Sequence, residues 1–278
     1  MSNPSEYHLR GGAWVHVRAR LPEDPGDIAL EPGAVIGADV EVGPGSWIGA
    51  HAVLSGPMRM GEKNQIFPTA ILGGPPQDLS YAGQPTRLEI GDRNIFREGV
   101  SAHRASAKAN GVTRIGSDNY FMGYCHIGHD CIIDDHVILA NGVLLGGHCH
   151  IQSFANLAGG CAAAHCVTIG RHAFVCGTAG VRRDLEPFIS HDLRRANVEP
   201  IPACINEVGL KRAGISAETI QKLKSAYKVL YLKRDALVDM ARARSEIEAR
   251  GAICPEVEEL LGFIERKRQG RFGRARTK

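Results

Sequence analysis

Residues 115–156 read, in blocks of six, IGSDNY FMGYCH IGHDCI IDDHVI LANGVL LGGHCH IQSFAN. Every block begins with Ile, Phe or Leu, and the spacing continues to Val181 with Ala163 as its smallest member. The same spacing runs from Leu30 to Leu72 and returns for three blocks from Ile90. A period of six matches neither the 3.6-residue repeat of a helix nor the alternation of a single strand, whereas it is the repeat of the hexapeptide β-helix.

The hexad repeat predicts which residues lie inside. Three short strands with tight corners close one triangular coil, so three hexads return the chain above itself at the strand spacing of ~4.8 Å. Each hexad contributes one inward aliphatic residue, and two positions before it stands a smaller residue that suits a narrow interior. This smaller position holds, among others, Ala34, Val40, Ser46, Ala52, Val137, Val143, Ala173 and Ala179.

Cysteine and glycine also follow the repeat. Four of the eight cysteines take the small interior position, namely Cys125, Cys131, Cys149 and Cys161. We therefore expect reduced core thiols there rather than disulfide partners or metal ligands. Glycine follows ten of the inward residues, and we expect these glycines to form corners that need positive φ.

The repeat also predicts the domains. It is interrupted over 74–87 and 103–114, which we predict to be loops, and it ends where Pro187 replaces an inward residue. From the N-cap Ser216 the apolar spacing becomes helical, with a second helix over 233–250 and a third opened by Pro255. In the second helix, the residues expected to face inward are Leu237, Met240, Ala241 and Ile247, and Gly251 is its stop. We predict a mainly β protein, with a left-handed parallel β-helix over 13–192 and a C-terminal α-helical domain over 193–278 that covers its open end.

Composition restricts the class of protein. The 278 residues are 44% hydrophobic and 23% charged, as in globular proteins. No apolar run approaches the ~18 residues of a membrane span, and the first residues are polar, so we expect a cytoplasmic protein. The net charge is +3, yet residues 266–278 alone carry seven Lys or Arg and no acid. Such a basic tail is either simply solvated or meets an acidic partner, a membrane surface or nucleic acid.

Seven of the twelve histidines fall between 126 and 172. His129, His148 and His165 are one coil apart to within one residue, so we expect a column of imidazoles on one face. A metal site is one interpretation, but His129 and His165 would be about 9.6 Å apart, so a shared ion would need ligands from two subunits. General-base catalysis is the other, because it needs one histidine and a carboxylate, and Asp130 follows His129 directly.

Several motifs go beyond what the hexads require. They are QDLSYAGQPTR at 77–87, EIGDRN at 89–94, HR at 103–104, IGSDN at 115–119, HIGHDC at 126–131, GLKR at 209–212 and AYK at 226–228. Together they closely resemble the UDP-N-acetylglucosamine acyltransferase family, and the likeness extends from about residue 13 to the tail. The hexads are shared by many acyltransferases, but the first loop and the HIGHDC run are specific to this family.

The resemblance implies a homotrimer with an active site in each groove between neighbouring β-helices. There a 3-hydroxyacyl chain passes from acyl carrier protein to the glucosamine 3-hydroxyl of the UDP-sugar, the first acylation of lipid A synthesis, without cofactor or metal. His129 would be the general base, Asp130 its orienting partner and the Gly147 N–H the oxyanion donor. The implied substrate-binding residues are Gln77, Asp78, His126, His148 and His165 for sugar and acyl chain, Asn206 and Arg212 for the nucleotide, and Gly177 for the depth of the acyl groove.

The sequence departs from the family pattern at five single positions, and residues 194–200 form a longer linker than the family has. Ser80 replaces a basic residue, Ala164 a histidine, Val208 an acid and Ala213 a second arginine, while His165 stands in the place of a glutamine. The catalytic positions are unchanged, so the reaction type is expected to hold while the acceptor stays open. A 3-amino analogue of the sugar would use the same base. Two further alternatives are a metal hydratase of the carbonic anhydrase type and a non-catalytic β-helix scaffold.

Overall fold

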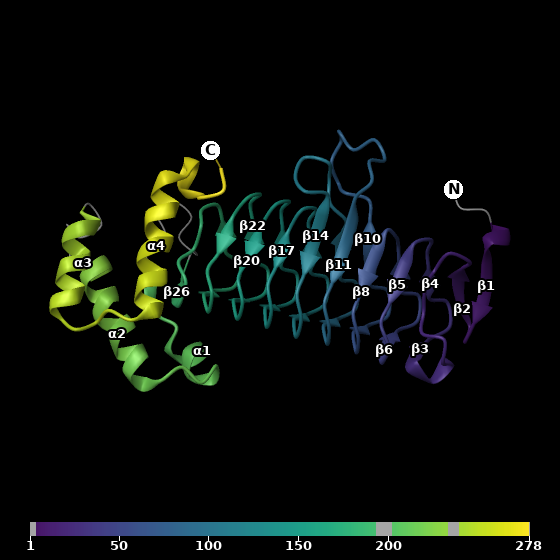
Figure 1. The fold of residues 1–278 in the computed structure, drawn as a ribbon, viewed down its shortest axis with the longest axis horizontal. Helices are drawn as coiled ribbons and strands as arrows, with labels where there is room; N and C mark the ends of the chain where they lie inside the picture. The colour runs from purple at the N-terminus through teal and green to yellow at the C-terminus, as the bar shows by residue number, and fades with distance from the viewer. Residues whose placement is uncertain (1–3, 193–201, 233–238, 278) are drawn as a thin grey trace.

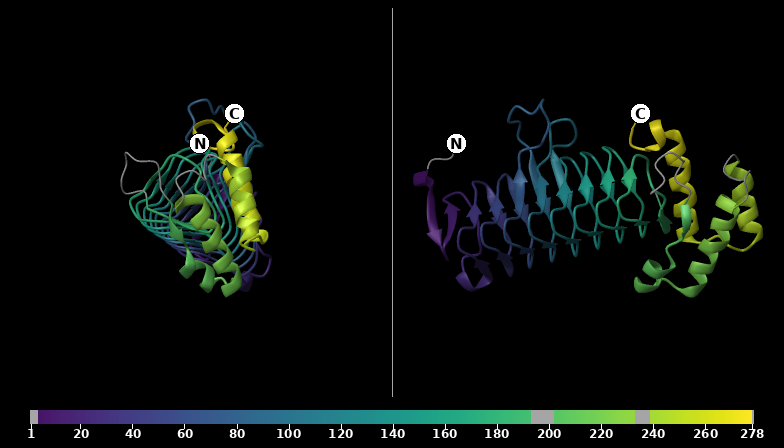
Figure 2. Two further views of the ribbon diagram at one scale, coloured as in Figure 1. Left: turned by 90° about the vertical axis from the view of Figure 1, so that its left-hand side faces the viewer. Right: turned by 180° about the vertical axis from the view of Figure 1, so that it is seen from behind.

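A computed structural model describes residues 4–192, 202–232 and 239–277. Most of the chain winds into stacked triangular coils, and the helices lie at one end of the stack (Figures 1 and 2). The coils form three sheets, one for each side of the triangle. Short 3-10 helices are η1 (Pro4–Glu6) and η2 (Pro25–Asp27) at the start of the chain, and η4 (Arg271–Gly273) near its end.

Sheet A contains β1 (Tyr7–Arg10), β2 (Ala13–His16), β4 (Val35–Ile36), β7 (Val53–Leu54), β10 (Ile71–Gly74), β13 (Ser101–His103), β16 (His126–Ile127), β19 (Leu144–Leu145), β22 (Ala162–Ala163) and β25 (Gly180–Val181). Sheet B contains β5 (Val40–Val42), β8 (Met58–Met60), β11 (Arg87–Ile90), β14 (Val112–Ile115), β17 (Ile132–Ile133), β20 (His150–Ile151) and β23 (Thr168–Ile169). Sheet C contains β3 (Ile28–Leu30), β6 (Ser46–Ile48), β9 (Gln65–Ile66), β12 (Ile95–Phe96), β15 (Tyr120–Phe121), β18 (Ile138–Leu139), β21 (Asn156–Leu157), β24 (Phe174–Val175), β26 (Ile189–His191) and β27 (Pro202–Ile205). Apart from β1 and β27, all strands pair in parallel, which confirms the predicted β-helix.

The interior matches the hexads. Every inward hexad residue from Ile36 to Val181 is buried, and Leu30 at the start is half-buried. The smaller position is buried as well, and its four cysteines are free thiols in the core, as predicted. Burial raises the pKa of Cys125 to about 11. A protonated thiol is a poor nucleophile and metal ligand, so Cys125 serves packing.

The two predicted loops leave the coil without disturbing its register. Ile127 pairs with Leu145 in the next coil, eighteen residues on. Ile90, however, pairs with Met60, thirty residues earlier, and with Ile115, twenty-five residues later. The extra residues project from the stack between β10 and β11 and between β13 and β14, and both loops lie at one corner of the triangle (Figures 1 and 2).

The prediction about glycine was wrong. Of the ten glycines that follow an inward residue, only Gly73 has positive φ, and the left-handed corners are held mostly by other residues, such as Asp130 and His148. The glycines are needed instead because the next coil approaches closely. A Cβ on Gly91 would lie 2.5 Å from Ser117 Oγ, and one on Gly116 would overlap Asp135 Oδ1.

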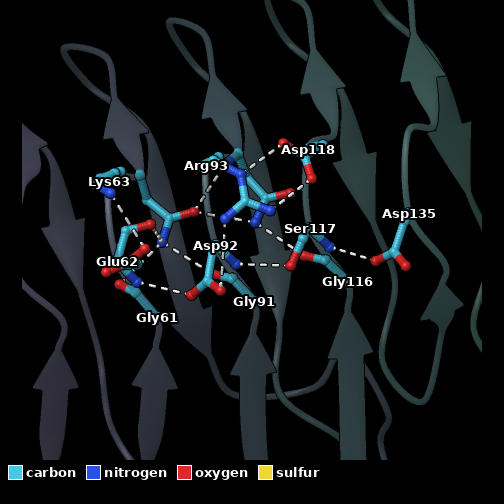
Figure 3. A network of polar contacts seen from close by, with 12 residues as sticks. Gly61, Glu62, Lys63, Gly91, Asp92, Arg93, Gly116, Ser117, Asp118 and Asp135 are labelled. Carbon is cyan, nitrogen blue, oxygen red and sulfur yellow. Dashed lines mark hydrogen bonds and ion pairs between the residues drawn. The ribbon is translucent and has the colours of Figure 1, made fainter.

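Those oxygens cap the backbone of the preceding coil (Figure 3). Ser117 Oγ accepts from the N–H of Asp92 at 3.0 Å, and Asp135 Oδ1 accepts from the N–H of Ser117 at 2.6 Å. Beneath them, the fully buried Asn94 donates to Asn64 Oδ1 at 3.0 Å and accepts from the N–H of Asn119. Each coil therefore satisfies polar groups that its neighbour would otherwise leave unpaired.

The helical part contains α1 (Glu207–Arg212), α2 (Ala217–Tyr227), the π-helical η3 (Lys228–Leu232), α3 (Met240–Ala249) and α4 (Pro255–Gln269). As predicted, Ser216 caps α2, accepting from the Thr219 N–H, and Gly251 ends the second helix with φ +63°. Residues 233–238, including Leu237, lie outside the described residues. Ala241 was wrongly predicted to face inward. It is exposed because Asp239 starts α3 in a phase that buries Ala243 and Ile247.

The helices share a second core with the last coil. Phe188 and Ile189 pack in it beside residues of α2 and α4, and this core covers the end of the stack (Figure 2). Among the described residues, no helix has the length and apolar character required to cross a membrane.

Candidate active site

His129 and Asp130 lie together at the corner from which the loops project. Asp130 adopts the left-handed corner conformation, φ +61°, and its Oδ2 lies 2.7 Å from Nδ1 of His129. The same oxygen accepts from the backbone N–H of Ser106 at 2.9 Å and from its hydroxyl at 2.7 Å. The Asp130 side chain is 1% exposed and that of His129 16%. This fixed carboxylate favours the tautomer with the proton on Nδ1, which leaves Nε2 of His129 as a proton acceptor.

Gly147 lies directly against the His129 ring. A Cβ at this position would be 2.6 Å from Cε1 and 2.7 Å from Nε2 of His129, although its backbone does not need glycine, because its φ is not positive. Throughout the described residues, no acceptor takes a hydrogen bond from the Gly147 N–H. A backbone donor thus stands beside the imidazole, free to bind an incoming oxygen.

His148 completes the group. Its ring meets that of His129 edge-on, with centroids 5.2 Å apart, which confirms the predicted stacking of the two. Burial lowers the pKa of His148, an effect that Asp130 opposes and that His129, Arg276 and His165 reinforce. His148 is therefore neutral near pH 7. His165 stands one coil further on, at the position equivalent to Gly147.

The same residues form a potential metal site. Within the part of the chain that the structure describes, His129, Asp130 and His148 are the group whose ligand atoms lie close enough, within 4.8 Å of one another. His129 Nδ1 already forms a 2.7 Å hydrogen bond with Asp130 Oδ2, so an ion bound through that nitrogen would have to replace it. Three donors on one Asp130 oxygen fit a base and its carboxylate better than a ligand set.

Asp78 in the first loop is held by residues of both loops. Its Oδ2 lies 2.7 Å from Lys108 Nζ, and its Oδ1 accepts from the N–H and the hydroxyl of Ser80 at 2.9 and 2.8 Å. The hydrogen bond from Lys108, with those from Ser80, holds the pKa of Asp78 well below its usual range. Lys108 of the second loop therefore places a positive charge beside Asp78. Gln77 is exposed beside it.

His126 lies on the outward face of β16. Its Nδ1 is 2.8 Å from Ser101 Oγ, and its ring meets that of His103 at 4.9 Å. Burial lowers the pKa of both, that of His103 to about 4. These two histidines therefore add two further imidazoles to the group around His129.

The other predicted residues lie elsewhere in the chain. Asn206 caps α1, accepting from the Gly209 N–H at 3.1 Å and donating to the carbonyl of His172 at 2.9 Å. It borders a cavity of about 410 Å³. The cavity is lined by Ser190, Cys204, Ile205, Asn206, Glu207, Val208, Lys224, Tyr227, Lys228 and Leu232. Arg212 is exposed on α1.

Gly177 lies at a third corner, next to Thr178, and its φ is not positive. Backbone conformation therefore does not explain the glycine. A Cβ there would meet the Gly159 carbonyl at 3.2 Å. His172, to which Asn206 is bonded, belongs to a different corner from Asp130, so one chain does not bring Gly177, Asn206 and His129 together.

Sequence reasoning missed Ser106 and Lys108. Both belong to the second inserted loop, where no repeat restricts a side chain, so the spacing gave no signal. A polar loop inserted beside the HIGHDC run was the one available indication.

The chain is similar to known proteins over most of its length. Residues 184–272 match the family model described as Udp N-acetylglucosamine O-acyltransferase, Domain 2, and residues 113–147 match the bacterial transferase hexapeptide model. The chain is 32% identical to LpxA from Acinetobacter baumannii, over 90% of this chain and 96% of that one, with a TM-score of 0.78. It is 28% identical to LpxA of Bacteroides fragilis, a UDP-N-acetylglucosamine acyltransferase, over 93% of this chain and 97% of that one, with a TM-score of 0.81. It is 32% identical to the UDP-N-acetylglucosamine acyltransferase of Francisella novicida, over 89% of this chain and 90% of that one, with a TM-score of 0.68.

Proposed function

The chain belongs to the UDP-N-acetylglucosamine acyltransferase family, and we propose that it transfers a 3-hydroxyacyl chain from acyl carrier protein to the glucosamine 3-hydroxyl of UDP-N-acetylglucosamine. The observation that carries this proposal is the buried Asp130 carboxylate bonded to Nδ1 of His129, with the Gly147 N–H beside the ring. In the proposed pathway this is the first acylation of lipid A synthesis. A cytoplasmic location is part of the proposal, because acyl carrier protein delivers the donor there.

The chemistry follows from the three groups. Nε2 of His129 removes the proton of the 3-hydroxyl while the sugar oxygen attacks the thioester carbonyl. The carbonyl oxygen becomes an oxyanion that accepts a hydrogen bond from the Gly147 N–H. When the C–S bond breaks, the thiolate of the carrier takes the proton from the imidazolium, which regenerates neutral His129. Asp130 stabilises the imidazolium between these steps, and no cofactor or metal is needed.

The remaining residues bind substrate in this proposal. Asp78 is ionised and accepts hydrogen bonds from sugar hydroxyls, while Lys108 holds its carboxylate in position. The other proposed contacts are Gln77, His126, His148 and His165 along sugar and acyl chain, Gly177 at the end of the acyl groove, and Asn206 and Arg212 at the nucleotide.

A homotrimer is part of the proposal, and two observations support it. The outward row of sheet A is apolar at both ends, with Trp14, Val35, Val53 and Ile71 before Ser101 and His126, and Leu144 and Ala162 after them. Trp14, Ile71 and Leu144 are 47, 47 and 50% exposed. The outward row of sheet B begins with four charged residues, Glu41, Arg59, Glu89 and Arg114, and continues with Ile132, His150 and Thr168. The exposed apolar side chains of sheet A suit a protein contact. Subunits joined through it would also bring the Asn206 end of one chain toward His129 of another.

Mass spectrometry of reaction products tests the function. The purified protein is incubated with UDP-N-acetylglucosamine and 3-hydroxyacyl carrier proteins of several chain lengths. We expect a UDP-sugar that gains one acyl group, and we expect His129→Ala to abolish it. His150→Ala is the matched control, because His150 pairs with Asp134 on sheet B, away from the site. An active His129→Ala variant would refute the assigned base.

The same assay separates the acceptors. A product ester is cleaved by mild alkali, whereas an amide formed on a 3-amino sugar is not. Acylation of the 3-amino sugar alone would move the assignment to an N-acyltransferase. No product with either sugar would favour a β-helix scaffold.

A further inference from the structure

The basic C-terminal tail is folded against the β-helix at the corner of the candidate site. Nε of Arg274 donates to the carbonyl of Arg182 at 2.8 Å, and one of its terminal nitrogens donates to the carbonyl of His165 at 3.1 Å. Arg276 donates to the carbonyl of His148 at 2.8 Å. These carbonyls belong to three successive coils, so the tail advances along the corner toward His129 at roughly one coil, ~4.8 Å, for every two residues. The C-terminus and the inserted loops accordingly lie at the same corner (Figure 2).

This placement is specific, because a set of hydrogen bonds holds the tail. The fully buried Asp184 accepts from the N–H of Ala275 at 2.7 Å and donates its own N–H to the carbonyl of Gly273 at 2.8 Å. The hydroxyl of Thr277 donates to the carbonyl of Arg271 at 2.7 Å, which closes the tail into a loop. The tail is thus a built part of the corner rather than a freely solvated run of charge.

The guanidinium groups brought there have no anionic partner among the residues that the structure describes. Neither Arg274 nor Arg276 forms an ion pair with a carboxylate in these ranges. Arg276 donates one N–H to the His148 carbonyl, so four of its five N–H donors remain for another group. Two guanidinium groups on residues two apart, neither of them ion-paired with a carboxylate in the described residues, suit an anion, and the planar fork of guanidinium matches phosphate oxygens in pairs.

We propose that Arg274 and Arg276 form a phosphate-binding site at the edge of the active site, which holds a phosphate ester of a substrate. The inference rests on the proposed function, in which both substrates carry phosphate, the donor in its phosphopantetheine arm and the acceptor in its diphosphate. Arg276 binds the carbonyl of the residue after Gly147, and it lies about one coil from His129. A phosphate held there positions the substrate at the reacting atoms.

Steady-state kinetics with matched donors tests the site. The variants are Arg276→Ala, Arg274→Ala and Arg276→Lys, and the control is Arg271→Ala, whose guanidinium lies over its neighbour Phe272 and not on a coil carbonyl. The donors are 3-hydroxyacyl carrier protein, 3-hydroxyacyl phosphopantetheine and 3-hydroxyacyl pantetheine, which lacks the phosphate. We expect Arg276→Ala to raise the KM for the substrate whose phosphate it binds about tenfold. We expect partial recovery of this KM in Arg276→Lys and no change in the control.

The pattern of KM values identifies the phosphate. If the donor supplies it, KM rises for acyl phosphopantetheine and not for acyl pantetheine. If the acceptor supplies it, KM rises for the UDP-sugar with every donor. Unchanged KM values for all substrates, or an equal rise for the two pantetheine donors with an unchanged KM for the UDP-sugar, would overturn the proposal.

A binding measurement separates this inference from the proposed function. Titration of the full-length protein with inorganic pyrophosphate in a calorimeter requires no turnover. We expect binding to wild type and to Arg271→Ala, and about tenfold weaker binding to Arg276→Ala. Such a result would support the site even if no acyl transfer were found. Equal binding to wild type and to Arg276→Ala would refute it whatever the activity.

Discussion

Replacing Gly147 by alanine tests whether His129 acts from the position seen in the structure. The new Cβ would lie 2.6 Å from Cε1 and 2.7 Å from Nε2 of His129, whereas ordinary contacts begin at 3.4 Å. The imidazole must therefore move by about 0.8 Å or more. A displacement of about 1 Å at a reacting group lowers the rate by roughly a hundredfold. Because the φ of Gly147 is not positive, the backbone accommodates alanine and the fold should persist.

The assay for Gly147→Ala is the initial rate of acyl transfer at saturating substrates, followed by mass spectrometry. We expect kcat to fall about a hundredfold, while KM for the UDP-sugar changes little and the melting temperature stays within a few degrees of wild type. Gly180→Ala is the matched control, since no atom lies within 4 Å of its added Cβ and its φ is not positive either. A Gly147→Ala enzyme that keeps kcat within threefold of wild type would refute the reasoning, because the base would then tolerate a displacement that the mechanism forbids.

Four further substitutions test the site and the fold. Asp130→Asn should lower kcat about a thousandfold at unchanged melting temperature, because an amide does not hold the His129 tautomer; a loss below tenfold would remove Asp130 from the mechanism. His172 is 2% exposed, and burial lowers its pKa to about 4. The unfolded chain, with a pKa near 6.5, therefore binds the proton more readily between those values, and stability is lost as pH falls from about 6.5 to 4. His172→Phe should reduce the drop in urea midpoint between pH 7 and 5, since phenylalanine can stack on Phe154 in the same way; an equal drop in both proteins would contradict this linkage. Asn94→Ala should cost about 2–4 kcal/mol in unfolding free energy, because it leaves buried partners unpaired. Arg93→Ala, which removes the exposed ion pair with Asp118, should lower the unfolding free energy much less, because an exposed ion pair contributes little. Similar losses in these two variants would show that the buried asparagines contribute little.

The core of this protein was predictable because its period is enforced by geometry. A residue that faces a narrow interior once in every six positions has to be apolar, and the alignment of coils then followed from counting residues. The stacking of His129 on His148 was predicted in the same way. The conformation of the corners was not predicted, because nothing in the sequence marks Asp130 or His148 as residues with positive φ. The glycines that can be seen in the sequence are required instead by the close approach of the next coil.

Contacts made by non-periodic segments were also beyond prediction. Ser106 and Lys108 reach Asp130 and Asp78 from a loop that no repeat positions. Arg276 reaches His148 from a tail more than a hundred residues away in the chain, and only the folded helices bring it there. The positive charge of Arg276 could be read from the sequence, but the residue that it contacts could not.

These unpredicted contacts have a common physical origin, which also explains where the candidate site lies. The coils present nearly identical corners, so periodicity alone makes no corner chemically different from another. The corner of His129 differs because three segments outside the repeat meet there. The second loop supplies Ser106 to the buried carboxylate, the first loop presents Asp78, and the tail supplies Arg276. A chemical site on a repetitive scaffold requires such a break in symmetry, since a pocket needs groups that the repeat does not provide. The contacts that the period does not predict are, for that reason, those that make the corner of His129 different from the other corners.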